Sequence, residues 1–192
     1  MEGRAAAREV GLAACRSVIQ LSGRAVRAVH RGEPARAAAL ADEAEAHLRR
    51  ASTSLAPHPS LVNAGFLHDA AKEYVEARAT LALVAGAPVP PAEELGVDAP
   101  AWLNGLAEAA SELRRHALDR LREGDTARAD ELLATMDEVF AELVAIDLHD
   151  SVTGGLRRTL DALRAVVERT RGDVTAAVLQ RQLREAIDRR LS

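Results

Sequence analysis

Apolar residues recur along this chain at intervals of three and four, which is the spacing of one face of an α-helix. Glycine and proline interrupt this pattern at intervals. No stretch alternates apolar and polar residues as a strand of a sheet does. The pattern predicts long helices over residues 4–31, 34–55, 60–86, 100–123, 125–147 and 156–191, and a single helical turn at 92–95.

Long helices joined by short loops are typical of antiparallel neighbours, so the sequence predicts an all-α, single-domain antiparallel bundle of about six to seven helices over residues 1–192. The segment HDSVTGG at 149–155 predicts a loop, and Gly172 with Asp173 offers a joint within the last helix. Several helices are longer than a compact monomer of this length needs. We therefore expect an oligomer.

Composition agrees with close-packed helices, because the chain is 48% hydrophobic, mostly alanine and leucine, and only 2% aromatic. Its net charge of −4 means that nucleic acid would need a local basic surface. The single cysteine, Cys15, excludes an internal disulfide and a cysteine-based metal site. Since no apolar run has the length of a membrane span and no signal peptide is evident, we expect a cytoplasmic protein without membrane contact.

Three acids, Asp69, Glu73 and Glu76, follow the edge of an apolar helical face. At about 100° per residue they fall within roughly 60° of one another, beside the core face rather than opposite it. Carboxylates grouped in this way, joined by another from a facing helix, are the usual ligands of Mg²⁺, or of Mn²⁺ in its place. The competing interpretation is a solvated surface, or acids paired with the abundant arginines.

A second acidic pair, Asp137 and Glu138, lies on the helix predicted over residues 125–147. Asp137 is at the edge of the apolar face and Glu138 is nearly opposite. Periodicity alone favours Asp137 as an inward ligand. An oligomer that buries the opposite side of the helix would make Glu138 the ligand instead.

Arginines on the first and last helices could hold the phosphates of a nucleic acid through bidentate hydrogen bonds. The alternative is that they pair with nearby Asp and Glu. Only four aromatic residues are present, so recognition would depend on backbone and shape rather than on base stacking. The sequence also lacks HExxH, GxSxG and glycine-rich phosphate motifs. The candidate nucleic-acid-binding residues are Arg16, Arg24, Arg27, Arg31, Arg157 and Arg158.

The segment KEYVEA at 72–77 resembles the motif of translin and, above all, of translin-associated factor X (TRAX). Three other segments resemble the same family, in the same order along the chain, from about Cys15 to Asp173. They are RAVHRGE at 27–33, AWLNGLAEAASELRRHALDRLREGD at 101–125 and LRRTLDALRAVVERTRGD at 156–173.

This resemblance implies an all-α fold that assembles into a hollow octamer and binds RNA or single-stranded DNA on its inner wall. In the TRAX branch, acids on that wall bind Mg²⁺ and cut RNA, whereas translin mainly binds and scaffolds. The two glutamates of the motif correspond to Glu73 and Glu76, and the third acid to Glu138 or Asp137, depending on the register around Phe140. Glu112 in ELRR is expected to be a structural partner of an arginine.

From the resemblance we expect an RNA-binding, Mg²⁺-dependent endoribonuclease that cuts RNA inside a hollow homo-oligomer, similar to the archaeal relatives. The expected metal and catalytic acids are Glu73, Glu76 and either Asp137 or Glu138, and Asp69 could extend the metal site. The alternative is a translin-like scaffold that binds RNA or single-stranded DNA without cutting it.

Overall fold

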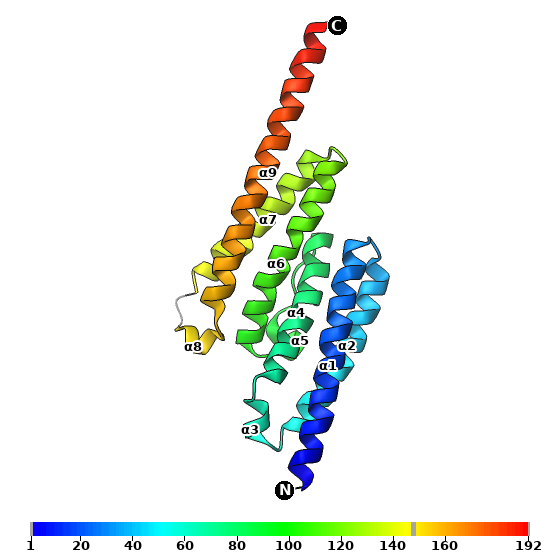
Figure 1. Ribbon diagram of the computed structural model, residues 1–192, viewed down its shortest axis with the longest axis vertical. Helices are drawn as coiled ribbons and strands as arrows, with labels where there is room; N and C mark the ends of the chain where they lie inside the picture. The colour runs from blue at the N-terminus through cyan, green and yellow to red at the C-terminus, as the bar shows by residue number, and fades with distance from the viewer. Residues whose placement is uncertain (1, 147–148, 192) are drawn as a thin grey trace.

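The computed structural model describes residues 2–146 and 149–191, and within them every regular element is helical (Figure 1). Six helices are long, and three consist of a single turn. The all-α bundle predicted from the sequence is therefore confirmed. In chain order the helices are α1 (Glu2–His30), α2 (Pro34–Leu55), α3 (Pro59–Val62), α4 (Phe66–Ala85), α5 (Ala92–Leu95), α6 (Ala99–Arg122), α7 (Thr126–Val144), α8 (Asp150–Thr153) and α9 (Leu156–Leu191).

Most predicted boundaries agree with the structure because local signals set them. Pro34 begins α2, and the Asp125 side chain accepts a hydrogen bond from the Arg128 backbone N–H and so caps α7. The continuous helix predicted over 60–86 is wrong. Its first turn is the separate helix α3, and the chain turns before Phe66 at Gly65, whose φ of +89° suits glycine.

Two further expectations need correction. The segment 149–155, expected to be a loop, contains the helical turn α8. The joint expected at Gly172 and Asp173 is absent, because α9 passes through both residues without a break. An ion pair of 2.9 Å between Arg114 on α6 and Asp173 holds this part of α9 against the bundle. The predicted end of the fifth long helix, Asp147, lies outside the described residues.

The long helices form a layered series, with α4 and α6 at its centre (Figure 1). α1 packs against α2 and α4, α4 packs against α6, and α6 packs against both α7 and α9. Buried apolar side chains form two clusters, one mainly from α1, α2 and α4, the other mainly from α6, α7 and α9. Because α4 and α6 contribute to both clusters, their contact joins the two halves of the core.

Gly105 allows α4 and α6 to approach closely. A Cβ atom added at this position would lie 2.7 Å from the backbone oxygen of Lys72 and 2.7 Å from Cβ of Val75. Such separations are shorter than normal van der Waals contact, so only glycine fits here without displacing α4. This close approach lies beside the KEYVEA segment, one helical turn before Glu108 on α6.

The last part of α9 extends past the bundle, and the C-terminal end of the chain lies far from the N-terminal end (Figure 1). Every described residue from Leu179 to Leu191 is exposed. None of the helices in the described part of the chain combines the length and apolar character that crossing a membrane requires.

Candidate metal centre

Three carboxylates meet where α4 faces α6. Glu73 and Glu76 project side by side from α4 because residues three apart are neighbours on a helix surface, and Glu108 reaches them from α6. One oxygen from each lies within 4.8 Å of the others, and all three side chains are partly buried. Magnesium binds oxygen ligands at about 2.0–2.1 Å, so modest side-chain adjustments would let all three carboxylates share one ion.

A lysine stands at the edge of this acidic cluster of Glu73, Glu76 and Glu108. The Lys72 ammonium donates a hydrogen bond of 2.8 Å to Oε1 of Glu108 and lies 3.9 Å from Oε1 of Glu73. Glu76 has no hydrogen bond or ion pair within the described residues. The cluster therefore holds one partly buried carboxylate that no cation of the chain contacts directly.

The crowding of these carboxylates changes their proton affinity. Burial raises the pKa of Glu76 to about 8, and the negative charges of Glu73, Glu108 and Glu112 add to the effect. Burial also raises the pKa of Glu73; the positive charge of Lys72 opposes that rise, while Glu108 and Asp69 add to it. An added positive charge, whether a proton or a metal ion, therefore stabilises this group of carboxylates.

A chain of hydrogen bonds starts one helical turn beyond Glu108. Glu112 Oε2 lies 2.6 Å from Nε2 of His30, and Nδ1 of His30 lies 3.1 Å from Nε2 of His116. The hydrogen bond from His30 lowers the pKa of Glu112 despite its burial. The partner of Glu112 is therefore a histidine of α1, and the expectation of an arginine partner is wrong. Burial, followed by the charge of His30, lowers the pKa of His116 to about 4.

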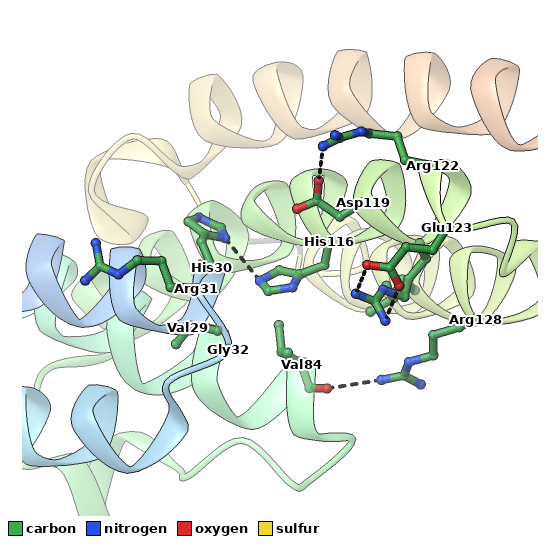
Figure 2. A pocket seen from close by; sticks show the side chains of 12 residues that line it. Val29, His30, Arg31, Gly32, Val84, His116, Asp119, Arg122, Glu123 and Arg128 are labelled. Atoms are coloured by element: carbon green, nitrogen blue, oxygen red, sulfur yellow. Dashed lines mark hydrogen bonds and ion pairs between the residues drawn. The ribbon is translucent and has the colours of Figure 1, made fainter.

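His30 and His116 also line a cavity of about 590 Å³ near the ends of α1 and α6 (Figure 2). The two imidazoles point toward one another, and the arginines around them are bound to groups of the chain itself. These contacts are Arg120 with Glu123, Arg122 with Asp119, and Arg128 with the backbone oxygen of Val84. The arginine side chains of this cavity therefore already have partners, unlike Glu76 in the acidic cluster.

The other predicted acids lie elsewhere. Asp69 is exposed, close enough for its charge to act on Glu73 but outside the group of three. Asp137 forms an ion pair of 2.6 Å with Arg171 of α9, and Glu138 is exposed on α7. Within the described residues of one subunit, neither α7 acid joins Glu73 and Glu76.

Glu108 is the site residue that sequence reasoning missed. Its signal was the segment NGLAEAASEL, in which a glycine precedes an acid by one helical turn among small residues. A glycine in such a run marks a face that another helix can approach closely, and an acid on that face is carried toward the neighbour. Periodicity of the helix alone does not identify which helix that neighbour is.

The predicted arginines divide into two groups. Arg16, Arg24 and Arg27 are exposed on one face of α1, within about 80° of one another, and their side chains form no hydrogen bond or ion pair within the described residues. The same holds for the side chains of Arg157 and Arg158 at the start of α9. Arg31 differs, because it pairs with Glu33 at 3.0 Å.

Comparison with known proteins finds relatives both by sequence and by structure. No family model matches the sequence. An uncharacterized protein of Methanocaldococcus jannaschii is 29% identical over 137 residues, which are 71% of this chain and 60% of that protein. This chain therefore spans about 60% of the length of that curated relative.

Solved structures match over almost the whole chain. The crystal structure of AfC3PO is 32% identical, covers 94% of both chains and superposes with a TM-score of 0.86. The structure of AfC3PO in complex with duplex RNA is 33% identical with the same coverage and a TM-score of 0.74. Apo-NeC3PO, 21% identical over 89% of each chain with a TM-score of 0.80, shares the fold.

Proposed function

Because the chain belongs to the translin/TRAX family of C3PO proteins, we propose that it is an RNA-binding, Mg²⁺-dependent endoribonuclease that acts as a hollow homo-oligomer. The observation that carries the proposal is the meeting of Glu73, Glu76 and Glu108 between α4 and α6. Hard oxygen ligands on two helices, one of them without a cation partner, are suited to a hard divalent ion. Mn²⁺ is expected to replace Mg²⁺ because it accepts the same ligands.

Within this site the side chains have distinct roles. Glu73, Glu76 and Glu108 would hold the ion, and the fixed spacing of α4 and α6 would position it. Magnesium, when bound in such a site, supplies a more acidic water as nucleophile and offsets charge on the leaving oxygen. Glu112, kept ionised by His30, adds negative potential beside the site without leaving its histidine partner.

RNA is proposed as the substrate because AfC3PO, which this chain resembles over 94% of its length, has been solved with duplex RNA. The unpaired arginines on α1 and at the start of α9 supply the positive charge that phosphates need. Single-stranded DNA would meet the same arginines. The contacts available are to the backbone, so we expect weak dependence on base sequence.

Homo-oligomerisation is supported by apolar side chains that the single subunit leaves in water. Leu179, Leu183, Ile187 and Leu191 follow one another at intervals of four on the projecting part of α9, each between 48% and 83% exposed. An apolar row of this size marks an association surface. From the family resemblance we propose an octamer of identical chains.

One observation favours a scaffold without catalysis. Glu108 already pairs with the Lys72 ammonium and Glu112 is already hydrogen-bonded to His30, so two of the acids have partners in the chain itself. A non-catalytic translin-like protein that binds RNA or single-stranded DNA is therefore the second candidate.

Cleavage of a labelled, partly single-stranded RNA distinguishes the two functions. The assay compares Mg²⁺ with EDTA for the wild type, for a Glu73→Gln/Glu76→Gln double variant, and for a Glu43→Gln/Glu142→Gln control, in which two exposed, unpaired acids change charge equally. Cleavage that needs Mg²⁺ and is lost only in the first variant supports the nuclease. Binding without cleavage supports the scaffold, and undiminished cleavage by the first variant rejects the cluster as the metal site.

RNA binding is tested separately through its salt dependence. An Arg24→Gln/Arg27→Gln variant should bind RNA more weakly and reduce the slope of log K against log salt by about 1–2. The control is Arg36→Gln/Arg49→Gln, whose arginines on α2 already pair with Glu33 and Glu45. If both variants give the wild-type slope, the RNA surface lies elsewhere.

A further inference from the structure

Lys72 is the one lysine among the 25 lysine and arginine residues of the chain. It also stands at the one group of carboxylates that could share a metal ion within the described residues. Its ammonium reaches across from α4 to Glu108 on α6 at 2.8 Å, and its side chain is only 23% exposed. Elsewhere the chain forms its ion pairs with arginine or histidine.

Lysine and arginine differ in how they hold a carboxylate, and this difference affects how easily a metal ion could replace Lys72 at Glu108. An arginine would hold a carboxylate through a planar, bidentate pair, whereas an ammonium is a compact charge on a flexible stem. Burial lowers the pKa of Lys72, but the hydrogen bond and charge of Glu108 and the charges of Glu73 and Glu76 outweigh burial and raise it. Lys72 therefore carries its positive charge at the cluster.

We propose that Lys72 is the resident counter-cation of the acidic cluster, and that a divalent cation must displace its ammonium from Glu108 in order to bind. The inference rests on the proposed metal site and deepens it. The ammonium occupies an oxygen of Glu108 and places a positive charge within 3.9 Å of Glu73. It thereby stabilises the three carboxylates when no metal is present and competes with the metal when one arrives.

Two physical costs follow for metal binding. The hydrogen bond from Lys72 to Glu108 has to break before Glu108 can direct that oxygen to an ion, and charge-assisted bonds of this kind are among the stronger ones. A cation that remained at this distance would repel the incoming ion. The stem of Lys72 is flexible, so its ammonium can swing away toward solvent without any movement of the helices.

Direct measurement of Mg²⁺ and Mn²⁺ binding to the full chain by calorimetry, at one pH for every variant, tests the inference. Lys72→Met retains the apolar stem and removes the charge, and it should bind both ions tighter by a factor of about ten or more. The control Arg78→Met removes one charge from the same helix, at a residue paired with Asp42 and Glu45, and should leave the affinity unchanged. Equal or weaker binding by Lys72→Met overturns the proposal.

A second measurement needs no substitution. Because Lys72 is the one lysine in the sequence, isotope labelling of lysine gives a single side-chain NMR signal for the native chain. Addition of Mg²⁺ should shift that signal with the same affinity that calorimetry reports, as the ammonium leaves Glu108. A signal that stays in place while Mg²⁺ binds overturns the proposal, even where Lys72→Met does not fold.

The two proposals fail in different ways. If Mg²⁺ binds to the wild type and is lost in Glu76→Gln, but Lys72→Met has wild-type affinity, the metal site stands and the counter-cation role is overturned. If Lys72→Met binds Mg²⁺ tighter but no RNA is cut by any form of the protein, the counter-cation role is supported and the nuclease function is rejected.

Discussion

The acids of the α4–α6 contact and the acids of α7 look alike in the sequence but have different surroundings in the structure. Glu73 and Glu76 meet a further carboxylate, Glu108, from the facing helix. Asp137 meets a guanidinium, that of Arg171 on α9, at 2.6 Å. The α4–α6 acids gather like charges between two helices, whereas Asp137 faces an opposite charge and Glu138 is exposed without an ion pair among the described residues.

The difference shows that helical periodicity identifies which acids lie at the edge of an apolar face. The helix packed against that face determines whether those acids meet further acids or basic groups. Glu73 and Glu76 on α4 and Asp137 on α7 each flank an apolar face, as their spacing predicts. A candidate metal site forms only where the neighbouring helix adds a further carboxylate. Gly105 lets α6 approach α4 closely enough for Glu108 to contribute that carboxylate. Predictions that separate the two groups therefore test the site itself.

The largest expected difference concerns the third carboxylate. In the cleavage assay, Glu108→Gln should reduce the rate by a factor of about 100 or more, because it replaces a carboxylate ligand of the proposed ion by a neutral amide. The control Glu138→Gln removes the same charge at an exposed position on α7, and it should leave the cleavage rate within about twofold of the wild type. The reverse pattern would place the third ligand on α7, as the motif register around Phe140 suggested.

A substitution at Gly105 tests the close approach of α4 and α6 directly. Gly105→Ala adds a Cβ atom against backbone, so α4 has to move, at a cost of about 1–3 kcal/mol in the free energy of unfolding. The matched control is Gly23→Ala on α1, where the added Cβ meets only the flexible end of Arg27 at 3.5 Å. This control should stabilise the helix by up to about 1 kcal/mol.

Both glycine variants are measured by chemical unfolding, together with Mg²⁺ affinity. Gly105→Ala should also weaken Mg²⁺ binding, because Glu108 would be carried away from Glu73 and Glu76. If Gly105→Ala unfolds like the wild type and binds Mg²⁺ equally well, the geometry of this contact does not build the site.

The features of the fold and of the site that could be predicted from the sequence are those set by nearby residues. Asp125 as a cap, the turn at 92–95 and the inward edge of Glu73 and Glu76 all depend on residues within one or two helical turns. The break between α3 and α4 was missed because the segment around Gly65 continues the apolar pattern across a left-handed glycine. Glu108 and the pairing of Asp137 with Arg171 were missed because both depend on which helices are neighbours in space, which periodicity does not contain.

The raised pKa of Glu76 gives the cluster a pH dependence. Between the usual carboxyl value of 4.5 and about 8, the folded chain keeps a proton on Glu76 that the unfolded chain has released. The folded state binds more protons in this window, so its stability falls as pH rises. The free energy of unfolding of the wild type relative to Glu76→Gln should fall by about 1.4 kcal/mol per pH unit, and so by up to about 5 kcal/mol over the window.

Thermal or chemical unfolding at a series of pH values, for both proteins without metal, measures this difference. The contribution of His116 has the opposite sign, since its pKa of about 4 makes stability fall as pH falls below 6.5. It is present in both proteins and cancels in the comparison. Parallel curves for wild type and Glu76→Gln would show that Glu76 does not hold its proton above the usual range.

The smallest expected effect belongs to the α7 pair. Asp137→Asn removes the charge that Arg171 contacts, but both side chains are about one-third or more exposed, so solvent already screens their attraction. The free energy of unfolding should change by less than about 1 kcal/mol, and Mg²⁺ affinity should not change at all. Calorimetry and chemical unfolding of this variant beside Glu76→Gln measure both quantities. If Asp137→Asn weakened Mg²⁺ binding as much as Glu76→Gln does, the surface pair would belong to the metal site, through a subunit contact that one chain does not contain.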